Sequence, residues 1–210
     1  MPALAIKKKK TDGFLLSRES DGVELTIKSR IRINNYNEKQ KLLQDEEDLY
    51  ECFKNAATKK ALEEAVEKLF LRYGLQRRRA FTSASVAPIL LKYLNKIRQR
   101  DIVTLQNIQN VKEDFKCWNK TLSRELRRKE LPEVTLSKLL HFINPKRFWI
   151  IDSRVKSLMS IWGFEPNFSG CGDFLVELFS HKLFREFKAF LQKQDNRRPF
   201  LKSLDKVLWI

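Results

Sequence analysis

Residues 135–155 read TLSKLLHFINPKRFWIIDSRV, and this stretch decides the fold that we predict. It has the pattern of a short apolar helix, a turn at Pro145, a brief hydrophobic approach, and an aspartate that begins a second helix. Lys138 falls inside the first helix and Asp152 at the entrance of the second. An amine and a carboxylate delivered by consecutive helices form a candidate catalytic pair. The same arrangement is also how an ordinary helical protein turns a corner.

The rest of the chain supports a mainly α fold with an extended N-terminus. From Val23 to Ile33, apolar residues alternate with polar ones, which is typical of strands. We therefore expect 1–36 to be a basic N-terminal arm, a short β-like appendage that could contain strands. Residues 37–210 are expected to form a single all-helical domain, a compact bundle. Its helices are predicted over residues 38–56, 58–74, 86–99, 103–130, 153–162, 173–193 and 199–210, with glycine stops at 74 and 163 and a loop over 164–172.

The charge of the chain indicates a polyanionic partner. Its 210 residues carry a formal net charge of +16, an electrostatic signature expected of nucleic-acid-binding proteins. An anionic membrane or an acidic protein would also be attracted by this charge. Arg77, Arg78 and Arg79 precede a hydroxyl-rich segment, so this loop is either a phosphate-binding element or a solvated surface turn.

Several other classes of function are not expected. Cys52, Cys117 and Cys171 are far apart and form no Cys-x-x-Cys pair, so neither a zinc site nor a disulfide framework is predicted. No apolar run reaches the ~18 residues of a membrane span. We expect no metal and no cofactor, and a monomer that is cytoplasmic, or nucleoid-associated if the source is bacterial.

The region around Lys138 and Asp152 resembles the helix-hairpin-helix DNA glycosylase superfamily, in particular its 8-oxoguanine glycosylase-like branch. The family hairpin reads roughly Leu-Pro-Gly-Val-Gly-x-Lys, and Leu131, Pro132 and Val134 match it. The segments SKLLHFINP (137–145) and DSRV (152–155), and the closing LDKVLW (204–209), are also similar to small bacterial proteins of that fold. The similarity covers about residues 131–156 and the last few.

This resemblance implies a role for several residues. Lys138 would be the nucleophilic lysine and Asp152 the catalytic aspartate of an enzyme that removes a damaged or modified base from duplex DNA. The carboxylate would stabilise a sugar cation, and the amine would form a Schiff base that adds lyase activity. A flipped base would enter a pocket with aromatic walls. The candidates for this pocket are His141, Trp118, Phe148 and Trp149. The candidates for backbone binding are Lys146, Arg147, Arg154 and Lys156, together with the arginines at 77–79.

Structural roles remain open for the same residues. Lys138 could be a solvated helix lysine, Asp152 an N-cap, His141 a core histidine, and the tryptophans core residues. Glu133 and Thr135 occupy the positions of the family's hairpin glycines. This substitution favours an alternative function, a non-catalytic nucleic-acid-binding protein on the same fold. A helical protein that binds an acidic partner is a third possibility.

Overall fold

The computed structural model describes residues 4–9, 13–18, 24–28, 46–75, 82–128, 130–194 and 199–208. Within these ranges the chain is mainly helical, as predicted, with a three-stranded sheet at its N-terminus. The elements are β1 (Leu4–Lys9), β2 (Gly13–Arg18), β3 (Glu24–Lys28), α2 (Glu46–Asn55), α3 (Lys59–Arg72), α4 (Ser83–Arg98), the 3₁₀ turn η3 (Leu105–Asn107), α5 (Ile108–Glu125), α6 (Glu133–Ile143), α7 (Ser153–Ile161), α8 (Phe168–Ser180), α9 (Phe184–Gln194) and α10 (Phe200–Leu208).

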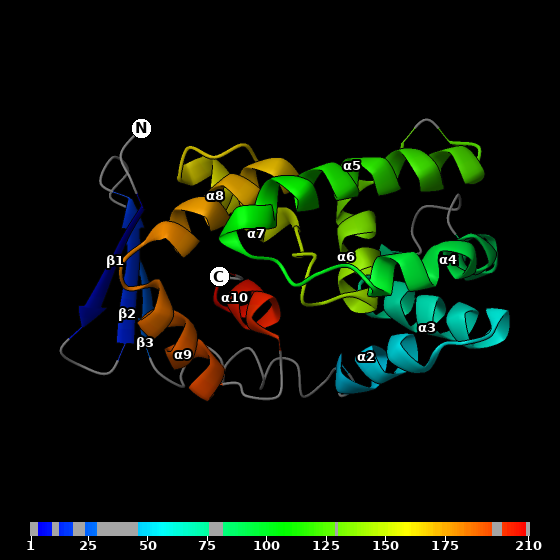
Figure 1. Cartoon of the computed structure of the whole chain (residues 1–210), viewed down its shortest axis with the longest axis horizontal. Helices are drawn as coiled ribbons and strands as arrows, with labels where there is room; N and C mark the ends of the chain where they lie inside the picture. The colour runs from blue at the N-terminus through cyan, green and yellow to red at the C-terminus, as the bar shows by residue number, and fades with distance from the viewer. Residues whose placement is uncertain are drawn as a thin grey trace.

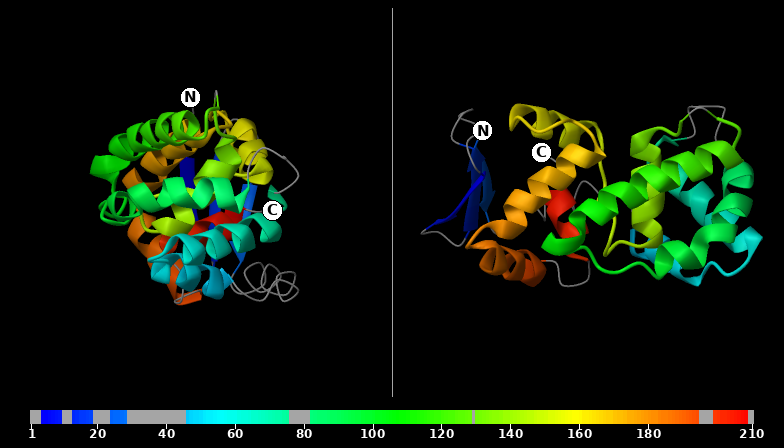
Figure 2. Two further views of the ribbon diagram at one scale, coloured as in Figure 1. Left: turned by 90° about the vertical axis from the view of Figure 1, so that its right-hand side faces the viewer. Right: turned by 45° about the horizontal axis from the view of Figure 1, so that its top comes forward.

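The helices form two groups along the long axis of the molecule. One group contains α2, α3, α4 and α6, and the other contains α7 to α10 with the sheet at its outer side (Figure 1). Helix α5 runs along both groups and packs against α4, α6 and α8. The right-hand view of Figure 2 shows the same division, with α5 bridging the groups. The segment that leads from α6 to α7 is a second connection between the two groups, in addition to α5.

The sheet packs against the helices, whereas the sequence predicted an N-terminal arm. Its strands are antiparallel in the order β1-β2-β3, and all six residues of β2 are buried. Arg18 of β2 donates a hydrogen bond to the carbonyl of Trp162, and its guanidinium lies 3.1 Å from Oε1 of Glu177. The backbone N–H of Leu4 donates to the same carboxylate at 2.9 Å. These contacts fix the sheet against α8. The alternation noted in the sequence corresponds to β3, while residues 29–36 lie outside the described ranges.

Local signals set several helix ends. Thr58 caps α3 by accepting a hydrogen bond from the N–H of Ala61, and Thr82 forms a capping box with Ser85 at the start of α4. Threonine is among the residues that satisfy the unpaired amides of a first turn. Gly74 and Gly163 have φ of 62° and 70° just beyond α3 and α7, which confirms both predicted stops.

Helix α8 begins earlier than predicted, and a break separates it from α9. Gly170 and Gly172 lie inside α8 rather than in a loop. A Cβ on Gly170 would lie 2.1 Å from the backbone oxygen of Glu165, and one on Gly172 would lie 3.0 Å from Cδ of Lys112. These glycines allow the close approach of neighbouring segments, so their presence reflects packing and not a turn.

Candidate functional site

Helix α6 is hydrogen-bonded to the segment that precedes α7. The hydroxyl of Ser137 accepts from the N–H of Ile151 at 3.2 Å, and its oxygen also lies 3.3 Å from the carbonyl oxygen of Ile151. Ser137 is the neighbour of Lys138, and Ile151 is the neighbour of Asp152. The fold therefore brings together the backbones that carry the two predicted catalytic residues.

Lys138 is a buried lysine, and so the alternative of a solvated helix lysine does not apply. Only 7% of the residue is exposed. Its Nζ lies 4.2 Å from the ring centroid of Tyr73, which follows the last turn of α3. The face of an aromatic ring attracts an ammonium group, which offsets part of the desolvation that burial imposes. The structure thus places a buried amine against an aromatic ring.

Asp152 caps α7, as one of the two predictions for it proposed. Its Oδ1 accepts hydrogen bonds from the N–H groups of Arg154 and Val155, both at 3.0 Å. A carboxylate at this position also interacts favourably with the helix dipole. The side chain is half-buried, so capping fixes the direction of a carboxylate that is still reached by solvent.

The predicted backbone-binding cations have different environments. Arg147 is buried, and its guanidinium binds Asp114 through Nε at 3.0 Å and Nη2 at 2.5 Å, an arrangement that holds the start of α5. Lys156 pairs with Glu133, with 2.7 Å between Nζ and Oε2. Lys146 and Arg154 are exposed. The arginines at 77–79 lie outside the described residues.

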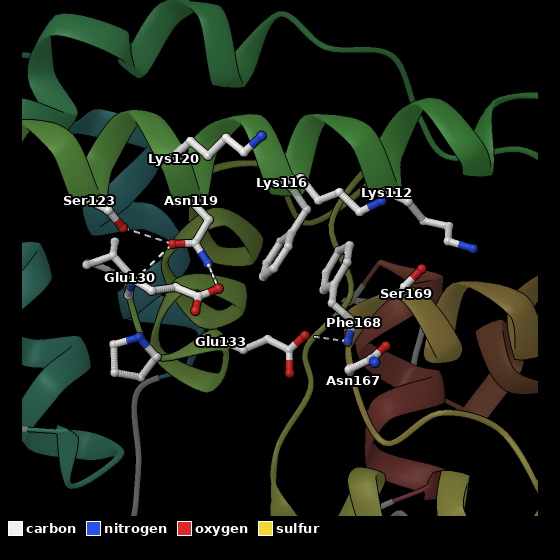
Figure 3. Close-up of a pocket in the computed structure, with 13 residues that line it drawn as sticks. Lys112, Lys116, Asn119, Lys120, Ser123, Glu130, Glu133, Asn167, Phe168 and Ser169 are labelled. Atoms are coloured by element: carbon white, nitrogen blue, oxygen red, sulfur yellow. Dashed lines mark hydrogen bonds between the residues drawn. The ribbon is translucent and has the colours of Figure 1, made fainter. Parts of the chain in front are cut away.

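A groove that was not predicted from the sequence lies beside residues 130–132, which lead from α5 into α6 and which we call the hairpin. It has a volume of about 700 Å³ and is bounded by α5, by residues 130–133, and by the start of α8 (Figure 3). Its lining comprises Lys112, Phe115, Lys116, Asn119, Lys120, Ser123, Glu130, Leu131, Pro132, Glu133, Asn167, Phe168 and Ser169. The signal in the sequence was the recurrence of lysine every fourth residue from 112 to 120, which places three amines along one side of a helix.

The hairpin itself is held by side chains from α5. Oδ1 of Asn119 accepts from the hydroxyl of Ser123 at 3.0 Å and from the backbone N–H of Leu131 at 3.1 Å. Its Nδ2 donates to Oε1 of Glu130 at 3.4 Å. The Leu131 amide, which belongs to the hairpin, is therefore used inside the protein. This network fixes residues 130 and 131 against α5.

Glu133 connects three helices. Its Oε1 accepts the backbone N–H of Phe168 at 2.6 Å, and its Oε2 bonds Lys156. The first amide belongs to α8 and the lysine to α7, while Glu133 itself begins α6. In Figure 3 the carboxylate points across the groove toward Phe168. An anionic group of the protein thus occupies the N-terminal end of α8.

The four residues predicted to form a base pocket are core residues. His141, Phe148, Trp149 and Trp118 are between 0% and 7% exposed, and none of them lines the groove. Nδ1 of His141 lies 2.7 Å from the carbonyl oxygen of Phe148, and Nε2 lies 2.6 Å from the hydroxyl of Tyr50. Because a carbonyl can only accept, Nδ1 carries the proton of this bond. His141 thus has the core environment that was left open as an alternative.

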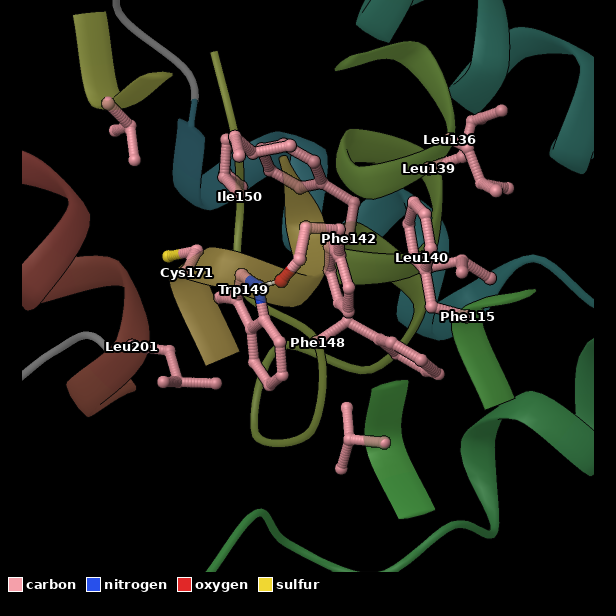
Figure 4. Packing of buried hydrophobic residues seen from close by; sticks show 14 of the residues in the cluster. Phe115, Leu136, Leu139, Leu140, Phe142, Phe148, Trp149, Ile150, Cys171 and Leu201 are labelled. Atoms are coloured by element: carbon pink, nitrogen blue, oxygen red, sulfur yellow. Dashed lines mark hydrogen bonds between the residues drawn. The ribbon is translucent and has the colours of Figure 1, made fainter. Parts of the chain in front are cut away.

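Trp149 is connected to the groove through stacked rings. It stacks on Phe168 with 4.2 Å between centroids, and Phe168 stacks on Phe115 with 3.7 Å. Phe115 and Phe168 line the groove, so its apolar wall continues into the core around Trp149 and Phe148 (Figure 4). Cys171 lies in the same region, where burial, together with neighbouring carboxylates, raises the pKa of its thiol. This thiol is therefore a packing group and not a nucleophile.

Comparisons with protein-family models, with curated proteins and with solved structures give no match to this chain. Among the residues that the structure describes, no group of three or more His, Cys, Asp or Glu side chains is arranged to hold a metal ion. Within the same ranges, no helix combines the length and the apolarity needed to cross a bilayer.

Proposed function

We propose that this chain is a DNA-binding base-excision enzyme of the DNA glycosylase type, which cleaves the N-glycosidic bond of a damaged or modified base. One observation carries the proposal. A buried amine on α6 and a helix-capping carboxylate at the head of α7 belong to segments that Ser137 and Ile151 join by a hydrogen bond. The resemblance of the same segments to helix-hairpin-helix glycosylases supports the proposal, as does the net charge of +16.

The two residues have complementary chemistry for this reaction. Breaking the bond between base and sugar develops positive charge on the sugar, which the carboxylate of Asp152 would stabilise. The neutral amine of Lys138 would attack the sugar carbon as the base departs. Ring opening then gives a Schiff base, from which a lyase step can break the strand. The exposed cations Lys146 and Arg154 would contact the DNA backbone near the flipped nucleotide.

The first test is excision of bases from duplexes that carry a panel of damaged or modified nucleotides, with borohydride present to reduce a Schiff base to a stable adduct. We expect release of one class of base by the wild-type protein, together with a trapped covalent complex. Lys138→Met keeps an apolar, flexible side chain in the buried site and should abolish trapping. If no base in the panel is released, the enzymatic proposal is wrong.

Two substitutions of Asp152 separate catalysis from helix capping. Asn is as good an N-cap as Asp, so Asp152→Asn should leave stability nearly unchanged while it abolishes excision. Asp152→Ala should lose about 1 kcal/mol of stability as well, because the cap is removed. Full excision by Asp152→Asn would show that the carboxylate has only a capping role.

A second candidate is a nucleic-acid-binding protein without catalytic activity. It is favoured by the hairpin, in which the Leu131 amide is bound by Asn119 and Glu133 replaces a glycine. This function predicts salt-dependent DNA binding that Lys138→Met leaves unchanged, with no base released. The excision assay and a binding titration on the same variants distinguish the two candidates.

A further inference from the structure

Helix α5 carries a row of exposed cations, of which Lys116 and Lys120 line the groove. Lys116, Lys120 and Arg124 follow one another at intervals of four residues within α5, and the exposed Arg128 lies just beyond its end. We call this row the α5 ridge. Four residues correspond to about 6 Å of rise and about 40° of rotation along a helix, so the first three members form a gently winding line. Figure 3 shows the lysines of α5, with Lys116 and Lys120 at the edge of the groove.

The acidic side chains near the ridge have partners within the protein. Asp173 pairs with Lys112 at 2.7 Å, and Glu130, which is exposed and lines the groove, accepts a hydrogen bond from Asn119 at 3.4 Å. Glu125 binds Lys92 at 3.0 Å and the hydroxyl of Tyr93 at 3.0 Å. Glu133 is bound to Phe168 and Lys156, as described above. Lys116 does pair with Glu113, with 3.2 Å between Nζ and Oε1, but both side chains are more than half exposed. An exposed pair of this kind contributes little and exchanges easily for another anion.

Arg127, just beyond the end of α5, has a backbone conformation that glycine would adopt with less strain. Arg127 has φ of 52°, a left-handed conformation that costs a residue with a Cβ about 1–2 kcal/mol. The N–H of Arg127 donates to the carbonyl of Arg124 at 3.0 Å, and that of Arg128 to Ser123 at 2.8 Å. This is a Schellman motif, in which glycine is the usual residue at the position of Arg127. Despite this cost, Arg127 places an exposed cationic side chain at the end of the ridge.

We propose that the α5 ridge, with Arg127 at its end, binds the phosphate backbone of a DNA strand that lies along the groove beside the hairpin. The inference rests on the proposed function, because it assumes that DNA is the ligand, and it identifies the face on which DNA lies. Regularly spaced cations along one helix complement regularly spaced phosphates, and flexible exposed side chains suit contacts that carry no sequence information. The hairpin amide of Leu131 is occupied, so side-chain charge takes over the role of phosphate binding.

The first experiment measures affinity and its salt dependence for a labelled 20-base-pair duplex by fluorescence anisotropy. The double variant Lys116→Gln/Lys120→Gln removes two ridge charges, and Lys54→Gln/Lys60→Gln removes two exposed charges from α2 and α3. Each phosphate contact adds about 0.9 to the slope of log affinity against log salt. We expect the ridge variant to bind roughly tenfold more weakly, with a slope lower by about two. The control variant should stay within about twofold of wild type.

The second experiment uses the native cysteines as a footprint. Cys117 is exposed on α5 and directly follows Lys116 in the sequence, Cys52 on α2 is partly exposed, and Cys171 is buried. Saturating duplex should slow the reaction of Cys117 with a maleimide several-fold and leave Cys52 unchanged. Poly-glutamate at equal charge concentration serves as the acidic-protein comparison, and we expect it to protect Cys117 less than DNA does.

The outcomes separate this inference from the proposed function. If the wild type binds DNA but the ridge variant equals the control and Cys117 stays reactive, the ridge is not the interface, although excision can still occur. If poly-glutamate protects Cys117 and DNA does not, the ridge serves an acidic protein. If no DNA is bound even at low salt, both proposals fail. Ridge-dependent binding without base release would support the inference and refute the enzyme.

Discussion

The carboxylate of Glu133 gives the most direct test of how the two groups of helices are held together. Glu133→Ala removes a hydrogen bond of 2.6 Å to the N–H of Phe168 and an ion pair of 2.7 Å with Lys156. A hydrogen bond to a charged acceptor contributes about 1.5–3 kcal/mol. The ion pair has side chains that are 23% and 32% exposed, so solvent screening limits it to about 0.5 kcal/mol. The free energy of unfolding should therefore fall by about 2–3 kcal/mol.

Urea denaturation followed by circular dichroism measures this loss, and thermal melting gives a second reading. At about 2–4 °C per kcal/mol for a chain of this size, Tm should fall by roughly 4–12 °C. Lys156→Met is the matched control, because it removes only the ion pair and should cost less than about 1 kcal/mol. Glu133→Gln keeps an oxygen acceptor without the charge and should lie between them. If Glu133→Ala costs no more than Lys156→Met, the bond to the start of α8 contributes nothing and the reasoning is refuted.

Three further predictions concern residues outside the proposed catalytic pair. Gly170→Ala should destabilise by about 1–3 kcal/mol, because its Cβ meets the backbone oxygen of Glu165 at 2.1 Å. A Cβ on Gly172 would lie 3.0 Å from Cδ of Lys112 and 3.1 Å from the ring of Trp149, and because these contacts are less severe, Gly172→Ala should lower the urea midpoint less. Burial lowers the pKa of His181 from its ordinary 6.5. As the pH drops, the unfolded chain therefore binds a proton at His181 before the folded chain does. The free energy of unfolding should consequently fall below about pH 6.5. His181→Gln should reduce the difference between the urea midpoints at about pH 7.5 and about pH 5.5. Arg127→Gly should raise the free energy of unfolding by about 1 kcal/mol, measured by urea denaturation. A decrease would show that the substitution relieves no strain.

Local chemistry explains which parts of the fold could be predicted from the sequence. Gly74 and Gly163 end helices because few other residues tolerate a positive φ, and Asp152 begins one because its side chain satisfies two backbone amides. Such signals depend on residues three or four positions apart. The helical spacing of apolar residues from α3 to α7 is a signal of the same kind, so the mainly α character was correctly predicted.

Packing between distant segments explains what the sequence could not reveal. Strand β2 has no alternation because both of its faces are buried, so its pattern does not resemble that of a half-exposed strand. Gly170 and Gly172 were interpreted as loop residues because nothing in the sequence shows that Glu165 and Lys112 approach them. Lys138 is buried by Tyr73, which is 65 positions earlier in the chain.

The same distinction applies to the candidate site. Lys138 and Asp152 were proposed from their residue types, their spacing and the family resemblance, and the structure shows a hydrogen bond between their neighbours, Ser137 and Ile151. The candidate base pocket could not be predicted in this way, because an aromatic residue suits a core and a binding wall equally well. His141, for example, has both ring nitrogens directed at other protein groups. The groove depends on α5 and α8 meeting across the hairpin, which no local pattern reveals.

The hairpin has a consequence for how this protein would hold DNA. Hairpin amides that bind a phosphate give contacts that are short and fixed in direction, and they draw part of their strength from the helix dipole. Here Asn119 uses the Leu131 amide, and the carboxylate of Glu133 lies at the start of α8. If the protein acts on DNA as proposed, its affinity must then come from flexible lysine and arginine side chains, whose binding to phosphates releases counterions but imposes little geometry.

Glu133→Gln should consequently strengthen DNA binding at low salt, because it removes a negative charge from the groove. A weaker complex would mean that Glu133 itself positions the groove for DNA. Anisotropy titrations of this variant at matched ionic strength decide between the two, and its measured stability shows whether the change in affinity is separate from a change in folding.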